Sequence, residues 1–141
     1  MGGTIATLTG SAGGNTINIS SGATLQANGS LGDGTDIVTL AGTLDTAGAA
    51  LDLGAGDETL TLSDGAVISG VGINAGAGND QLVLDNALAL AFSGGATAGF
   101  ESLLKQNSGV TTMTDSQSFS AGTTINDGAL NVMGTLETPS V

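Results

Sequence analysis

The sequence predicts an all-β protein that winds as one parallel β-solenoid over residues 1–141. Three observations support this prediction: a repeat of 22 residues, a strand-like alternation of side chains inside each repeat, and a composition poor in large side chains. Glycine supplies 25 of the 141 residues, whereas phenylalanine occurs three times and tryptophan and tyrosine do not occur. A thin interior between stacked strands suits a chain of this composition.

The repeat is visible in three segments that align without gaps. They begin at Gly32, Gly54 and Gly76, and the differences 54 − 32 and 76 − 54 are both 22. A period in the twenties is typical of a solenoid, because each coil can bury its apolar side only against its neighbours. We therefore expect equivalent residues to stack in two interior columns. These columns are Val38, Leu60 and Leu82, and Leu40, Leu62 and Leu84.

Each coil begins with a glycine-rich turn that leads into a strand. In the central repeat Leu60 and Leu62 alternate with Thr59 and Thr61, so one pair points inward and the other outward. Gly-x-Gly followed by Asp or Asn supplies the turn before the strand. A second strand is expected later in each of the three coils. These second strands are residues 42–44, 65–68 and 87–90.

The same pattern continues on both sides of the three repeats. Residues 15–19 and 21–25 form an earlier coil, and residues 123–136 contain the strands of the last coils. The length divided by the period gives about six coils. Residues 100–106 are too few for an independent helix, so we expect a strand or a bent corner there. No linker divides the chain, and residues 1–98 form its regular coils.

The charge balance excludes several classes of function. Thirteen acidic residues and one basic residue, Lys105, give a net charge of -12. One cation and three aromatic rings cannot build a surface for nucleic acid, and an anionic membrane surface would repel the chain. The longest apolar run, residues 87–92, is far shorter than the roughly 20 residues that span a bilayer, so we expect no membrane insertion. No signal peptide is apparent, and we expect Met1 to begin a segment excised from a longer chain.

Residues near the C-terminus carry a family resemblance. Residues 99–105 read Gly-Phe-Glu-Ser-Leu-Leu-Lys, residues 109–114 form a Thr-rich strand, and residues 119–132 contain Gly-Thr-Thr-Ile-Asn followed by Gly-Ala-Leu-Asn-Val. Together they resemble the passenger-associated repeat of bacterial autotransporters over residues 99–136. The preceding Gly-x-Gly coils are also similar to those of autotransporter passengers. The sequence departs from the family's glycine-rich pattern at Ser108 and over residues 115–118.

That resemblance implies a right-handed parallel β-helix that is exported by type V secretion across the outer membrane. It also implies that residues 99–136 assist folding of the passenger during export. We therefore expect an extracellular protein, displayed at the bacterial cell surface or secreted, that acts as a structural stalk and as an adhesion module presenting a long acidic face. Its expected partners are molecules of host cells or neighbouring cells, or further copies of itself.

Acidic residues before the strands are the candidate metal ligands, because Gly-x-Gly-x-Asp is also similar to the calcium-binding nonapeptide of RTX proteins. Coils stacked about 4.8 Å apart would align these side chains in a column, and a cation that prefers oxygen ligands would relieve their repulsion. RTX coils carry two nine-residue repeats per turn, however, whereas one motif recurs every 22 residues here. The candidates are Asp33, Asp36, Asp57, Glu58, Asn79 and Asp80.

We therefore expect a solvated acidic turn edge and no cofactor. A calcium-binding, RTX-like β-roll segment of a secreted protein is the alternative. Calcium would then be the bound ion.

No catalytic residue is expected, and we do not expect an enzyme. The chain has no histidine for a Ser-His or Cys-His pair, no arginine, and no tryptophan or tyrosine on which a sugar could stack. We expect Lys105 to form a surface ion pair of little energetic value. An ice-binding threonine ladder would start from Thr59 and Thr61, but its neighbours in register, Ile37 and Gln81, interrupt it. The three phenylalanines are expected to fill the core or cap its corners.

Overall fold

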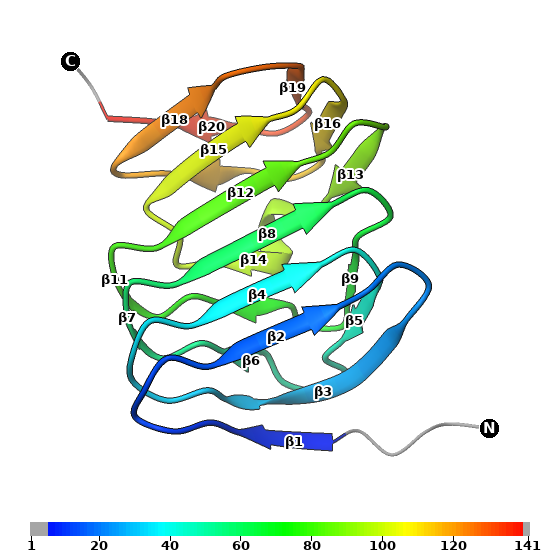
Figure 1. The fold of residues 1–141 in the computed structure, drawn as a ribbon. Helices are drawn as coiled ribbons and strands as arrows, with labels where there is room; N and C mark the ends of the chain where they lie inside the picture. Colours follow the sequence, from blue (N-terminus) through cyan, green and yellow to red (C-terminus); the bar gives the residue numbers. More distant parts are fainter. Residues whose placement is uncertain (1–5, 140–141) are drawn as a thin grey trace.

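The computed structural model describes residues 6–139, which wind into a parallel β-solenoid of about 6 turns with about 21 residues per turn. Every strand pair is parallel and joins one coil to the next. In Figure 1 the front strands run from left to right while the chain climbs, and the return strands pass behind them, which makes the winding right-handed. The predicted fold class is confirmed.

One side of the solenoid is a six-stranded sheet, which we call the front sheet. Its register pairs Val38 with Leu60 and Leu82, and Leu40 with Leu62 and Leu84, so both predicted interior columns are confirmed. The six leucine and valine side chains are at most 1% exposed. In order, the strands are β2 (Thr16–Ile19), β4 (Ile37–Leu40), β8 (Thr59–Ser63), β12 (Gln81–Asp85), β15 (Ser102–Gln106) and β18 (Gly122–Ile125).

The second side contains the expected second strands, but in two separate pieces. The first piece pairs the start of β3 (Thr24–Ser30) with β5 (Thr43–Asp45), and β5 with β9 (Val67–Ser69). The second piece consists of β13 (Leu90–Phe92), β16 (Val110–Met113) and β19 (Ala129–Val132).

The strand predicted at residues 87–90 is wrong, because β13 begins only at Leu90. Leu88 lies in the preceding turn with 68% of its surface exposed. Its backbone N–H donates to Asp64 Oδ1 at 2.9 Å, which holds the turn onto the coil below. The other predicted second strands correspond to β5 and β9.

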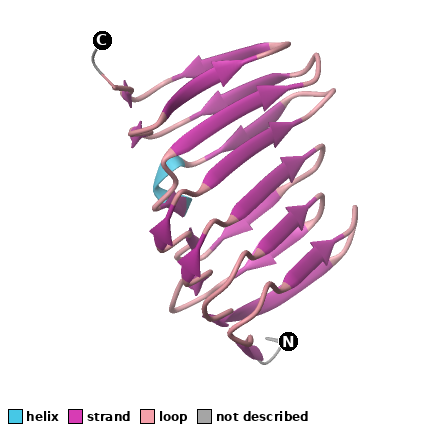
Figure 2. Cartoon of the chain, turned by 60° about the vertical axis from the view of Figure 1, so that its left-hand side comes forward, coloured by secondary structure: helices cyan, strands magenta, loops and turns pink. Residues whose placement is uncertain are grey.

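A third side was not predicted. Its strands are only two residues long in most coils, which is too short to show an alternation in the sequence. Four of them pair with one another or with the second half of β3: β1 (Ala6–Thr9), β6 (Leu51–Asp52), β10 (Ile73–Asn74) and β14 (Thr97–Ala98). Two further short pairs join β7 (Ala55–Gly56) to β11 (Ala77–Gly78) and β17 (Gln117–Ser118) to β20 (Leu136–Glu137). Figure 2 shows short strands of this side close to the turn of 3-10 helix at Gly94–Ala96, which is drawn in cyan.

Glycine at one corner allows the coils to approach closely. Gly54 and Gly76 have φ angles of +117° and +110°, a region that other residues rarely adopt. A Cβ atom at Gly54 would collide with the carbonyl oxygen of Gly32, and one at Gly76 would collide with that of Gly54. The 22-residue glycine repeat is therefore a packing requirement between neighbouring coils.

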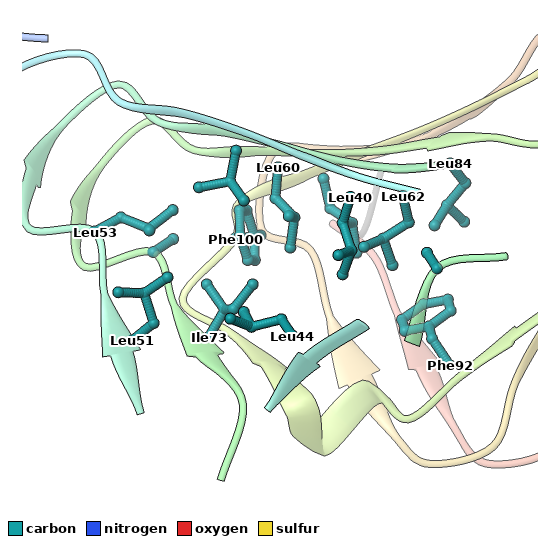
Figure 3. Close-up of a cluster of buried hydrophobic side chains, with 14 of the residues drawn as sticks. Leu40, Leu44, Leu51, Leu53, Leu60, Leu62, Ile73, Leu84, Phe92 and Phe100 are labelled. Atoms are coloured by element: carbon teal, nitrogen blue, oxygen red, sulfur yellow. The ribbon is translucent and has the colours of Figure 1, made fainter. Parts of the chain in front are cut away.

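The core is thin and lies along the solenoid axis, between the three sides. Figure 3 shows Leu60 and Leu62 of the front sheet facing Leu44 of the second side, while Leu51 and Ile73 enter from the third. The three phenylalanines, Phe92, Phe100 and Phe119, are all buried in this cluster, as expected. The predicted strand or corner at residues 100–106 is β15. Among residues 6–139 no helix is long and apolar enough to cross a membrane.

Candidate functional site

Three carboxylic acids are stacked inside the solenoid, one per coil, and we call them the acidic column: Asp36, Glu58 and Asp80. Their side chains are 0%, 1% and 0% exposed. Each acid comes two residues before a valine or leucine of the interior column, so strand alternation turns it toward the core as well. The prediction of a solvated edge is therefore wrong for these three residues.

The other three candidate residues lie on the outside of the same turns. Asp33, Asp57 and Asn79 are exposed. The backbone N–H of Asn79 donates to Asp57 Oδ1 at 3.1 Å, which links their two coils at the surface. The structure thus separates the six candidates into an inner and an outer set.

Backbone hydrogen bonds tie the acidic column to adjacent coils. The N–H of Glu58 donates to Asp80 Oδ1 at 2.8 Å, and the N–H of Asp80 donates to Glu101 Oε2 at 2.8 Å. At the lower end, the N–H of Asn15 donates to Asp36 Oδ1 at 2.6 Å. Asp36 and Asp80 thus each accept a hydrogen bond from the coil before them, whereas the carboxyl group of Glu58 accepts none.

The remaining oxygens of the column have no hydrogen-bond donor. They are Asp36 Oδ2, both Glu58 carboxyl oxygens and Asp80 Oδ2. Two ionised carboxylates can only accept, so Glu58 and Asp80 can bond to each other only when one of them carries a proton. Burial, together with the side-chain interaction with Asp80 and the nearby charges of Asp80, Asp36 and Asp57, raises the pKa of Glu58 to about 8. Glu58 therefore keeps its proton at neutral pH.

Within the described part of the chain, no three His, Cys, Asp or Glu side chains come together as a group that could hold a metal ion. The acids are distributed one per coil along the axis. The chemistry that this arrangement supports is hydrogen bonding between coils and proton uptake by Glu58.

Lys105 is buried, with 0% of its surface exposed, so the predicted surface ion pair is wrong. It follows Leu103 by two residues in β15 and therefore points inward, like the leucines below it. Its Nζ donates to the carbonyl oxygens of Gln106 at 2.7 Å and Asn107 at 2.6 Å. Alternation along residues 101, 103 and 105 could have revealed this inward position.

The outer surface of the front sheet carries one acidic residue, Asp85, in an outward column with Ser63 and Gln106, so this sheet does not present the expected long acidic face. Its other two outward columns carry no charge. One outward column consists of Thr16, Ile37, Thr59, Gln81 and Ser102. The next consists of Asn18, Thr39, Thr61, Val83, Leu104 and Thr124. The exposed acids Asp33 and Asp57 lie in the turns before the strands.

Comparison with known proteins gives no relative for this chain. No family model, no curated protein and no solved structure matches it.

Proposed function

We propose that this chain is a segment of a bacterial autotransporter passenger, displayed at the cell surface or secreted, that serves as a stalk and as an adhesion and self-association module. In this proposal residues 99–136 assist folding during export. The continuous parallel ladder of the front sheet supports the stalk role, because each coil binds the next by backbone hydrogen bonds and a shared core.

The observation that carries the proposal is that the two halves of the passenger-associated repeat, residues 99–105 and 119–132, lie in adjacent coils and contact each other. Residues 99–105 contribute β15, residues 119–132 contribute β18 and β19, and β15 pairs directly with β18. Lys105 and Gly128, one from each half, also meet. A Cβ atom at Gly128 would lie 2.9 Å from Lys105 Nζ, so the glycine leaves room for the buried ammonium group. The two halves of the motif thus pack against each other in adjacent coils, which supports a joint role in folding.

Refolding followed by pulsed hydrogen exchange tests the export role. If residues 99–136 assist folding, their backbone amides should gain protection before those of the regular coils up to residue 98. Earlier protection of the regular coils would contradict this role.

Self-association is tested by light scattering across a series of sodium chloride concentrations. A net charge of -12 opposes association at low salt, whereas the screening length falls to about 8 Å at physiological salt. The front sheet has a single acidic residue, Asp85, on its outer surface, which supports close approach of two copies once the charges are screened. We expect monomers at low salt and larger species at high salt.

A strictly monomeric protein at high salt and high concentration would contradict self-association. Adhesion would then require a molecule on a host or neighbouring cell. Displaying the chain on non-aggregating bacteria and following their attachment to host cells distinguishes that case from loss of adhesion altogether.

A further inference from the structure

The second side of the solenoid is open between two of its coils. Among the described residues β9 pairs with β5 and β13 pairs with β16, but no strand pair joins β9 to β13 (Figure 1). An open groove of about 220 Å³ lies between them. Val67 and Ile68 line one wall, and Ala91, Phe92 and Ser93 line the other.

Backbone groups of both strands face this groove. The N–H of Val67 donates to Gly42 O at 2.9 Å and the carbonyl of Ser69 accepts from Thr46 at 3.0 Å, so these two residues face β5. Successive residues of a strand direct their backbone groups to opposite sides, and Ile68 therefore faces the groove.

The same reasoning applies to the opposite wall. The carbonyl of Phe92 accepts from the N–H of Thr114 at 3.0 Å, so Phe92 faces the next coil and its neighbour Ala91 faces the groove. The groove thus lies between two parallel strand edges, each with an N–H and a carbonyl available for pairing.

Charge around the groove favours a basic occupant. Asp64 lies in the turn before β9, and Asp115 accepts a hydrogen bond from the hydroxyl of Ser93. The one basic residue of the chain, Lys105, is buried and offers no compensation at this surface.

We propose that the groove between β9 and β13 binds an extended strand of a partner protein by β-strand addition. The partner strand carries apolar side chains that contact Val67 and Phe92, lysine or arginine at its ends, and no acidic residue. A polypeptide backbone suits the site because its alternating donors and acceptors match those of a strand edge. This assignment goes beyond the proposed stalk and adhesion role and does not depend on it.

Hydrogen exchange of the protein alone is the first test. The amides of Ile68 and Ala91 should exchange fast, because no neighbouring strand covers them. The amides of Val67 and Thr114 are matched controls from the same region and should exchange slowly, because both donate to backbone carbonyls. Slow exchange at Ile68 and Ala91 would overturn the proposal, since it would mean that the two edges are already paired.

Peptide binding is the second test, with the capped pentapeptide Lys-Val-Val-Val-Lys as the probe, because its valines present an apolar side chain to each face of the sheet. We expect saturable NMR shifts and slower exchange at Ile68 and Ala91. The same peptide with its three inner residues N-methylated should not bind, because it cannot donate to a strand edge. Equal binding of both peptides, or no saturable shift at millimolar peptide, would overturn the proposal.

Two matched variants locate the site. Val67→Trp fills the groove from a residue that is 49% exposed, and it should weaken binding about tenfold. Val71→Trp places the same side chain at a residue that is 52% exposed but outside the groove lining, and it should leave binding unchanged. Equal effects of the two variants would overturn the assignment to this groove.

Discussion

Leu84 and Lys105 are direct partners in the ladder between β12 and β15, so a lysine occupies the next place in a column of leucines. Its aliphatic stem continues the apolar column, while its ammonium group binds the carbonyl oxygens of Gln106 and Asn107. A residue that looks like a surface charge in the sequence is thus a structural part of the C-terminal coils.

Replacing this lysine should destabilise the protein without preventing folding. Lys105→Met keeps most of the apolar stem but leaves two turn carbonyls without their donor, so we expect the free energy of unfolding to fall by about 1–3 kcal/mol. Urea denaturation measures the change. Leu104→Met, on the outer surface of the same strand, is the control and should have little effect.

The interior register can be tested at Leu62. Leu62→Asp would bury an unpaired charge in the leucine column, and we expect it to abolish cooperative folding. Thr61→Asp introduces the same charge one residue away on the outer surface of the front sheet and should fold normally. Thermal unfolding followed by circular dichroism compares the two, and unchanged melting of Leu62→Asp would contradict the register.

Stability should depend on pH through Glu58. Its pKa rises from 4.5 to about 8 on folding, so the folded protein holds a proton that the unfolded chain releases. The free energy of unfolding should therefore decrease as the pH increases between these two values, by at most about 1.4 kcal/mol per pH unit, and level off above them. Urea denaturation at a series of pH values measures this slope.

Glu58→Gln identifies the group responsible. The amide cannot ionise, so the variant should lose this slope and become more stable than the parent protein at alkaline pH. Asp33→Asn is the matched control, because Asp33 is exposed on the outside of the neighbouring turn and should leave the slope intact. A slope that persists in Glu58→Gln would assign the titration to another group.

Calcium should have only a screening effect. The acidic column forms no three-residue ligand group in residues 6–139, so millimolar calcium should raise the melting temperature little more than sodium chloride of equal ionic strength. The protein should also keep its β-sheet circular dichroism in a chelator, whereas a calcium-dependent roll would unfold. A large saturable shift that is lost in Asp80→Asn would support the RTX-like alternative instead.

The sequence was sufficient to predict the solenoid and its interior columns, because the 22-residue repeat keeps residues such as Leu40, Leu62 and Leu84 in equivalent places. It was not sufficient for the third side. Strands such as Leu51–Asp52 and Ile73–Asn74 contain two residues each, and their pairing depends on the coils above and below rather than on any local pattern.

The acidic column was missed for a different reason. Residue type suggested a solvent-exposed position for Asp36, Glu58 and Asp80, while their alternation with the interior column indicated an inward one. Position in the strand decided the outcome, because Asp36 and Asp80 accept backbone donors from the preceding coil and Glu58 keeps its proton, which makes burial of these acids tolerable. The missing strand pair between β9 and β13 could not be predicted either, because the 22-residue repeat runs through both coils without interruption.

The glycine corner makes the central coils interchangeable. Since Gly54 meets Gly32 in the coil below just as Gly76 meets Gly54, duplicating residues 54–75 would place a glycine opposite a glycine at each new junction. Unequal recombination between such coils would lengthen or shorten the protein by one whole turn while preserving this corner contact. The length of the solenoid can therefore change during evolution while the fold stays the same.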